Sequence, residues 1–519
     1  MERRSTRQRK TRRRKKEKLE LRVKIENFGP ISSGEVKLKP LTLFIGPNNS
    51  GKSYTAMLIR SILRAYDSRL LIGMPLPTKT LSKDKNFLHT ILSLKLASEL
   101  KNAFEEISKF LKAQINRLKK EEEIEIPQRI TKKISGIICK KLKERLSNEI
   151  SNSFACPLKE LVKTGEKNFV IRAYFNSHRI CVKCSENALG LEECPQPEVK
   201  IKVGKAKVSV RVGSRVSITE MNKSLWQETI GDEKRSVLAT YILNQVSNLY
   251  VSEILKIFST SVSCYYLPAA RSGILQGHKL LVASIIEQVP FVGIKRFEIP
   301  KFSGIVARFL SSIINLPQEK GSLYRLARTL EKELIEGQIM VSTLKREHYP
   351  EIRYLYKDKK IPLPRASSSV SELAPLILYL KYVVEPGDIL IIEEPEAHLH
   401  PRNQRVLAKF LVRLIRKGVK VIVTTHSEFL VEQLSNFILL SKVKFAQRSK
   451  RYKYERNDFL KPDETAVYVF RYSKKMKGFR TIAVKVTEEG IPQEEFLKID
   501  KALYEETIKL RREVSKDQE

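Results

Sequence analysis

The stretch that decides the fold runs from Leu41 to Leu63 and reads LTLFIGPNNSGKSYTAMLIRSIL. Its first five residues form an apolar run of the length expected for one buried strand of a parallel sheet. From Gly51 onward the apolar residues instead follow the spacing of a helix face. A buried strand, a short loop and a helix in this order predict an α/β fold with a mainly parallel sheet.

The loop between this strand and helix reads GPNNSGKS and fits the pattern G-x-x-x-x-G-K-[ST]. Its backbone N–H groups can point inward at phosphate oxygens, next to the positive end of the helix. Lys52 can reach the β- and γ-phosphates, and the Ser53 hydroxyl can ligate Mg²⁺. The alternative is a Gly/Asn-rich turn, but the flanking strand and helix favour a nucleoside triphosphate. The predicted nucleotide-binding residues are Gly46, Pro47, Asn48, Asn49, Ser50, Gly51, Lys52, Ser53 and Tyr54.

Composition excludes several classes of protein. None of the apolar runs in the 519 residues approaches the roughly 18 needed to cross a membrane, and the N-terminus has no secretory apolar segment. Six cysteines in so long a chain do not suggest a disulfide scaffold. We therefore expect a cytoplasmic protein without a membrane partner.

The net charge points to a polyanionic partner. Lys and Arg number 97 against 58 for Asp and Glu, which gives +39 and a pI near 9.9. Residues 1–18, MERRSTRQRKTRRRKKEK, are too basic and polar to fold and predict a disordered arm. We expect sequence-independent binding of nucleic acid. The alternative is that the source organism's proteins are generally rich in lysine, so that the excess positive charge reflects composition and not a ligand.

A cysteine cluster lies within a β-rich stretch from about residue 168 to 219. His178, Cys181 and Cys184 are spaced by two residues each, and Cys194 follows ten residues later. Four such side chains can hold tetrahedral zinc. No second C-x-x-C follows at the usual spacing, so ordinary thiols beside a turn are the alternative.

The second half of the chain adds acidic, basic and hydroxyl groups at element ends. Residues 388–396, DILIIEEPE, bring an acidic pair to the end of a buried strand, where ligands gather in open α/β sheets. Residues 420–426, KVIVTTH, are a second buried strand that ends in His426. Arg271 follows a third strand at 264–267, and Ser367, Ser368 and Ser369 precede a helix whose N-terminus can bind phosphate.

The motifs IENFGPI, GPNNSGKS, IEEPEAHLHP and TTHS resemble, in order and spacing, those of ABC-class ATPases of the branch with OLD-family and SMC/RecF-type proteins. The resemblance covers about half of the chain. It implies that residues 46–53 are Walker A, that Glu393 and Glu394 are Walker B, and that His426 is the switch histidine. It places residues 396–401 at the D-loop and residues 367–370 at the signature. Two departures are Glu393 where Walker B usually has aspartate, and Ser369 where the signature usually has glycine.

By this resemblance, Lys52, Glu394 and His426 are the catalytic residues, and Ser53 and Glu393 hold Mg²⁺. The remaining nucleotide contacts are expected from Arg271 and the three serines of the signature. The implied activity is slow hydrolysis of ATP by two copies that sandwich it, each signature facing the other copy's phosphate loop. Such a switch would act on nucleic acid or an effector protein in genome maintenance or phage defence.

Other functions are weighed against the sequence. A nuclease of the OLD type needs a Toprim domain with an Asp-x-Asp pair, and no Asp-x-Asp occurs here. An OLD-like ATPase subunit that supports a nuclease supplied in trans remains the alternative. A GTPase needs Asn-Lys-x-Asp, and the nearest string, NKSL at 222–225, lacks the aspartate. An ATPase subunit of a membrane transporter would usually lack the inserted lobe and the basic arm.

The predicted domain organisation interrupts the ATPase core with a lobe of unrecognised sequence. The segments are a basic arm at 1–18, the N-terminal part of the core at 19–73, an inserted helical and β-rich lobe at 74–260, the C-terminal part of the core at 261–442, and a C-terminal α/β extension at 443–519.

Overall fold

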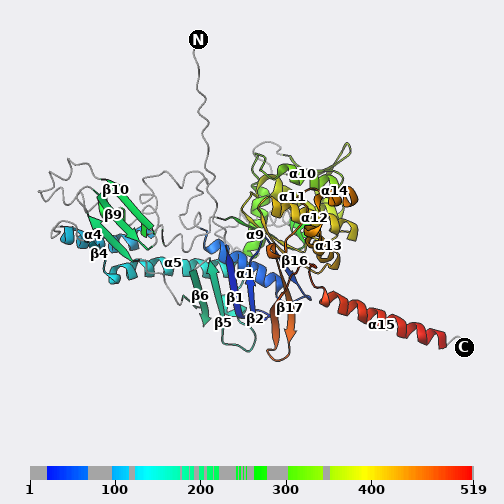
Figure 1. Ribbon diagram of the computed structural model, residues 1–519, viewed down its shortest axis with the longest axis horizontal. Helices are drawn as coiled ribbons and strands as arrows, with labels where there is room; N and C mark the ends of the chain where they lie inside the picture. Colours follow the sequence, from blue (N-terminus) through cyan, green and yellow to red (C-terminus); the bar gives the residue numbers. More distant parts are fainter. Residues whose placement is uncertain are drawn as a thin grey trace, which may run out of the picture.

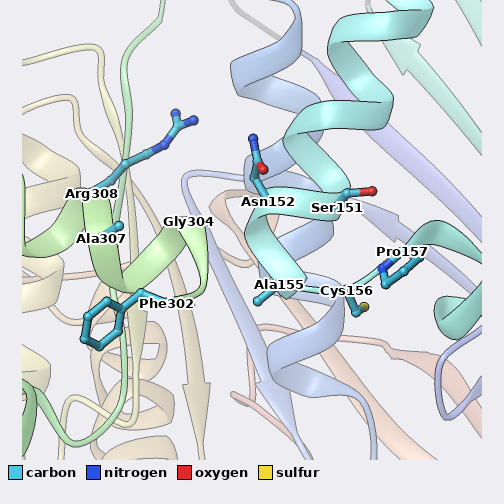
Figure 2. Close-up of a pocket in the computed structure, with 9 residues that line it drawn as sticks. All are labelled: Ser151, Asn152, Ala155, Cys156, Pro157, Phe302, Gly304, Ala307 and Arg308. Atoms are coloured by element: carbon cyan, nitrogen blue, oxygen red, sulfur yellow. The ribbon is translucent and has the colours of Figure 1, made fainter. Parts of the chain in front are cut away.

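The computed structural model describes most of the chain, with its longest stretches at 20–67, 123–175, 262–277, 302–342 and 351–516 (Figure 1). Shorter described pieces lie at 96–115, 178–185, 188–191, 198–203, 207–213, 215–220, 241–243, 245–246, 249–250 and 253. The basic arm at 1–18 lies outside the described residues.

Within the described residues, the strands form one large sheet and two small ones, in the orders β11-β15-β16-β3-β17-β18-β2-β1-β5-β6-β7, β10-β9-β8-β4 and β12-β13-β14. Their bounds are β1 Leu21–Phe28, β2 Ile31–Lys37, β3 Leu41–Ile45, β4 Glu123–Glu125, β5 Asn168–Phe175, β6 His178–Ser185, β7 Ala188–Leu191, β8 Val199–Val203, β9 Lys207–Val212, β10 Arg215–Glu220, β11 Cys264–Leu267, β12 Gln338–Ser342, β13 Glu351–Tyr356, β14 Lys359–Pro362, β15 Ile389–Glu393, β16 Lys420–Thr425, β17 Thr465–Ser473 and β18 Gly478–Val484.

The helices lie on both faces of the large sheet and beyond its ends (Figure 1). Their bounds are α1 Lys52–Ala65, α4 Leu96–Ile115, α5 Gln128–Phe154, α9 Gly304–Ile314, α10 Tyr324–Leu334, α11 Ser368–Tyr382, α12 Pro401–Arg416, α13 Glu428–Leu439, α14 Phe445–Tyr452 and α15 Glu494–Lys516.

The centre of the large sheet is parallel, as the sequence predicts. Strands β11, β15, β16, β3 and β17 all run the same way. Successive side chains of a strand point to opposite faces, so each strand supplies two cores. In β3, Phe44 packs with α1 and α5, whereas Leu41, Leu43 and Ile45 pack with the helices α11, α12 and α13. The sheet is therefore buried on both faces, in three layers.

The N-terminal strands extend this sheet beyond its parallel part. β1 and β2 pair antiparallel around the turn at Gly29 and Pro30. β1 also pairs with β5, and β5 continues into β6 and β7. Part of the predicted inserted lobe is thus built directly onto the ATPase sheet, while β4, β8, β9 and β10 form a separate sheet near α4 (Figure 1). The division into domains stays a prediction.

No helix among the described residues is long and apolar enough to span a membrane.

The predicted zinc ligands lie on β6 and beyond it. β6 pairs with β5 residue by residue from His178 to Ser185. Cys184 is buried, and Cys194 lies outside the described residues. Among the described residues, no group of three or more His, Cys, Asp or Glu side chains could hold a metal ion. The zinc site stays a prediction.

Candidate nucleotide-binding site

The phosphate loop requires two of its glycines. β3 ends at Ile45 and α1 begins at Lys52, as predicted. Gly51, the N-cap of α1, has φ 98°, and a Cβ there would lie 2.7 Å from Ile31 Cγ1. At Gly46, with φ 151°, a Cβ would lie 2.8 Å from the carbonyl oxygen of Phe470 on β17. A side chain at either position would meet both strain and a clash.

The backbone of this loop is free to receive phosphate. Within the described part of the chain, the N–H groups of Asn48, Asn49, Ser50, Gly51, Lys52 and Ser53 donate no hydrogen bond. The start of α1 adds the positive end of the helix dipole and has no acidic residue in its first turn. Unengaged donors of this kind fit a polyphosphate. Asn48 and Asn49 are exposed, so water occupies their donors until a phosphate replaces it.

Lys52 is held over the loop. Its Nζ donates to the carbonyl oxygens of Gly46 at 3.0 Å and Pro47 at 2.7 Å. Burial lowers the pKa of Lys52 to about 8, although the nearby charges of Glu394, Glu393 and Glu396 oppose this shift. The side chain is thus placed where phosphate oxygens would replace the carbonyl oxygens and restore the full charge.

Parallel strands bring the acidic pair to the same edge. β15 lies beside β16, and β16 lies beside β3, so Glu393 and Thr425 end next to the phosphate loop. Glu393 Oε2 accepts from the backbone N–H of Ala269 at 3.1 Å. Its Oε1 is buried and makes no hydrogen bond of ordinary geometry to a described residue. The buried Tyr266 hydroxyl is its neighbour: burial, and after it the charge of Glu393, raise the pKa of that tyrosine. A buried carboxylate oxygen beside a phenol fits a cation ligand such as Mg²⁺.

Glu394 is set in an unusual backbone conformation. It has φ 41°, and its N–H donates to the carbonyl oxygen of Thr424 at 2.9 Å. Its carboxylate is half exposed and lies 3.8 Å from His426 Nε2. Burial and the charge of Lys52 lower the pKa of His426, so the imidazole is neutral at pH 7. Glu394 and His426 therefore face each other beside the loop.

Sequence analysis missed the role of Glu396. Its Oε1 accepts from Thr425 Oγ1 at 2.6 Å and from the backbone N–H of His426 at 3.0 Å. Burial raises its pKa. Glu396 therefore fixes the end of β16 and the backbone of His426 that follows it. Its place two residues after the acidic pair was the available signal.

These geometries agree with the comparison to protein families. The family described as an AAA ATPase domain matches residues 21–431. The chain belongs to this family. No curated protein matches it. The predicted fold class is confirmed as an α/β P-loop NTPase, and the chain is an ATP-binding P-loop ATPase.

Solved structures with some similarity are head domains of SMC proteins. A Smc head bound to the C-winged helix domain of ScpA has 11% identity and a TM-score of 0.34, covering 89% of this chain and 97% of that one. A Smc head with an extended coiled coil, bound to the C-terminal domain of ScpA from Pyrococcus furiosus, has 11% identity and a TM-score of 0.34, covering 94% and 100%. The SMC head domain from Thermotoga maritima has 11% identity and a TM-score of 0.30, and the match covers 90% of this chain and 99% of that one.

Arg271 of this AAA ATPase domain lies behind the site and not in it. The residue is 1% exposed, and its NH2 pairs with Glu372 Oε1 at 3.2 Å. NH1 donates to the carbonyl oxygen of Glu393 at 2.7 Å, and NH2 to that of Glu394 at 3.3 Å. Nε donates to the carbonyl oxygen of Glu372 at 3.1 Å. The guanidinium is committed to the Walker B backbone, so a direct nucleotide contact, as predicted from the sequence, would require it to leave these partners.

The serine cluster caps α11. Ser367 Oγ accepts from the N–H of Val370 at 3.4 Å and lies 3.1 Å from Ser369 Oγ. Ser367 and Ser368 are exposed. Among the described contacts, no hydrogen bond or ion pair joins the cluster to the phosphate loop of its own chain.

The pKa of Lys52 predicts how ATP affinity changes with pH. Phosphate oxygens favour the charged ammonium, so binding takes up a proton once the free lysine is neutral. Affinity should be constant below the pKa of about 8 and fall above it, by up to about tenfold per pH unit. Titration with a fluorescent ATP analogue from pH 7 to 9.5 measures this. Lys52→Arg stays charged and should give a flat profile; a flat profile in the unchanged protein would contradict the prediction.

Proposed function

We propose that this chain is a slow ATPase and molecular switch in which two copies close around ATP. The observation that carries the proposal is the grouping of unengaged loop N–H donors, Lys52, Glu393, Glu394 and His426 at one sheet edge. In this reading the chain falls within the OLD-like branch, on the motifs IEEPEAHLHP and TTHS.

Each side chain has a distinct role in the proposed reaction. Ser53 and Glu393 would hold Mg²⁺, which when bound neutralises charge on the transferred phosphoryl group. Lys52 binds the terminal phosphates. Glu394 orients a water and receives its proton, and neutral His426, 3.8 Å away, steadies Glu394 and contacts the γ-phosphate. Closing the site requires a second wall over the exposed loop residues, and the exposed serines at the start of α11 are the group we assign to it.

The shared site is tested by mixing two inactive variants. Lys52→Ala removes the phosphate lysine, and Ser369→Arg blocks the serine cluster, so each alone should lose hydrolysis. In a dimer of one copy of each, one of the two sites is intact, and co-expression should restore roughly a quarter of wild-type turnover. Ser369→Arg with wild-type turnover would contradict the role of the cluster, and co-expression without recovery would contradict the shared site.

Binding of nucleic acid is proposed from the net charge of +39 and the arginine-rich arm at 1–18. Phosphate contacts release counterions, so log affinity should fall steeply with log salt and depend little on sequence. Deleting residues 1–18 should reduce that slope and weaken duplex and single-strand binding alike, as measured by fluorescence anisotropy. If the full chain binds neither even at low salt, the switch would act on an effector protein instead.

A further inference from the structure

Helix α15 leaves the body of the protein with a bare apolar face. It spans Glu494–Lys516 and projects from the rest of the chain, in red in Figure 1. Apart from Phe496 and Ile508, which are half-buried, its large apolar side chains are exposed, from 55% at Leu510 to 67% at Tyr504. An apolar face exposed to water along a helix of 23 residues is unfavourable, so we expect another molecule to pack against it.

The sequence of α15 is an internal repeat of eleven residues. Residues 494–504 read EEFLKIDKALY, and residues 505–515 read EETIKLRREVS. Three positions are identical, and four more exchange leucine, isoleucine or valine, or lysine and arginine. Eleven residues make three turns at about 3.67 residues per turn, so equivalent positions stack in a line along the helix. This is the spacing of a helix that pairs along its whole length with another.

The repeat places apolar residues in one broad band. The central stripe has residues three or four apart: Phe496, Ile499, Leu503, Thr507, Leu510 and Val514. Leu497, Tyr504 and Ile508 widen it on one side. Asp500 and Arg511 lie between the stripe and these wider positions. Most other charged residues occupy the rest of the helix, with ion pairs such as Lys501 with Glu505 along its outer face.

The charges at the two edges of the central stripe differ. On a helical wheel, Glu495, Glu506 and Glu513 border one edge, whereas Asp500 and Arg511 border the other. In a parallel pair of identical helices, one edge of the first faces the other edge of the second, so Glu506 meets Arg511 of the second helix. An antiparallel pair would put the wholly acidic edge against itself. The charge pattern therefore favours a second copy of the same helix in parallel orientation.

The root of α15 lies beside the nucleotide site. Glu495 forms an ion pair with Arg471 on β17, and the preceding residue, Phe470, is the one against which Gly46 of the phosphate loop packs. Two α15 helices that run in parallel about a shared two-fold axis would bring two such edges close to each other.

We propose that α15 pairs in parallel with α15 of a second copy of this chain, without nucleotide, and so tethers two ATPase cores. Tethering raises the effective concentration of one nucleotide edge for the other. This consequence rests on the proposed closure around ATP, whereas the helix pairing does not.

Cysteine cross-linking of the full chain without nucleotide tests the orientation. In a parallel pair each residue of the stripe meets its own equivalent, so Leu503→Cys and Leu510→Cys should each give a disulfide-linked dimer under mild oxidation. Glu505→Cys, on the outer face, is the matched control and should link no more than the unchanged protein, which also reports the native cysteines. Leu503→Asp with Leu510→Asp should shift the chain from dimer to monomer in light scattering.

Three results would overturn the proposal: a monomeric wild-type chain at micromolar concentration, cross-linking of Glu505→Cys equal to that of Leu503→Cys, or a wild-type chain that sediments with phospholipid vesicles and stays monomeric without them. The last would make a lipid surface the occupant. Each leaves the mixing of Lys52→Ala with Ser369→Arg unaffected, so a failure of pairing and a failure of the shared ATP site can be told apart.

Discussion

Replacing Glu394 with glutamine is expected to lower ATP turnover by about 10² to 10⁴-fold, the range typical for loss of a general base. Glutamine keeps the size and polarity of the side chain but cannot take a proton from water. The backbone N–H of Glu394 still donates to Thr424, so the strand end should keep its conformation. Phosphate release under saturating Mg²⁺ and ATP measures the change.

ATP binding should persist in Glu394→Gln, because the loop N–H groups and Lys52 are unchanged. Removing a negative charge near Lys52 will, if anything, slightly lower the lysine pKa, since Glu394 is the largest of the charges that raise it. Glu432→Gln, an exposed acid on α13, is the matched control and should hydrolyse ATP normally. Turnover in Glu394→Gln within a few-fold of the control would remove Glu394 from the catalytic role.

The parts of the site predicted from the sequence are those encoded locally. The strand, loop and helix at 41–63 are contiguous, so periodicity and the two glycines suffice to place them. The acidic pair and His426 are likewise recognisable as residues at the ends of buried strands, and in the structure β15 and β16 run parallel to β3.

The parts that sequence could not supply depend on contacts between distant residues. The position of Arg271 after a strand predicts a nucleotide ligand, but its partner Glu372 is 101 residues away and holds the guanidinium inward. The cysteine spacing likewise does not show that β6 pairs with β5 from His178 to Ser185, which depends on residues far apart in the fold.

Replacing Arg271 with leucine should produce the largest loss of stability among these changes. Glu372 is 1% exposed and would keep two backbone donors, the N–H groups of residue 271 and Ser272, both at 2.9 Å. It would lose its only charged partner among the described contacts. Breaking a buried ion pair costs about 3–5 kcal/mol. Because Glu372 keeps two hydrogen-bond donors, we expect the free energy of unfolding to fall by about 3 kcal/mol. Chemical denaturation measures the free energy of unfolding.

The same variant separates a positioning role from a purely structural one. Arg271 holds the carbonyl oxygens of Glu393 and Glu394, so its loss should also lower turnover in the fraction that remains folded. Lys381→Met is the matched control: it breaks another buried pair, with Glu331, that has no contact with Walker B. It should lose stability and keep turnover per folded molecule. Adding Glu372→Leu to Arg271→Leu removes the unpaired charge, and should recover much of the stability but not the turnover. Recovery of both would mean that Arg271 serves folding alone, and that Walker B keeps its geometry without it.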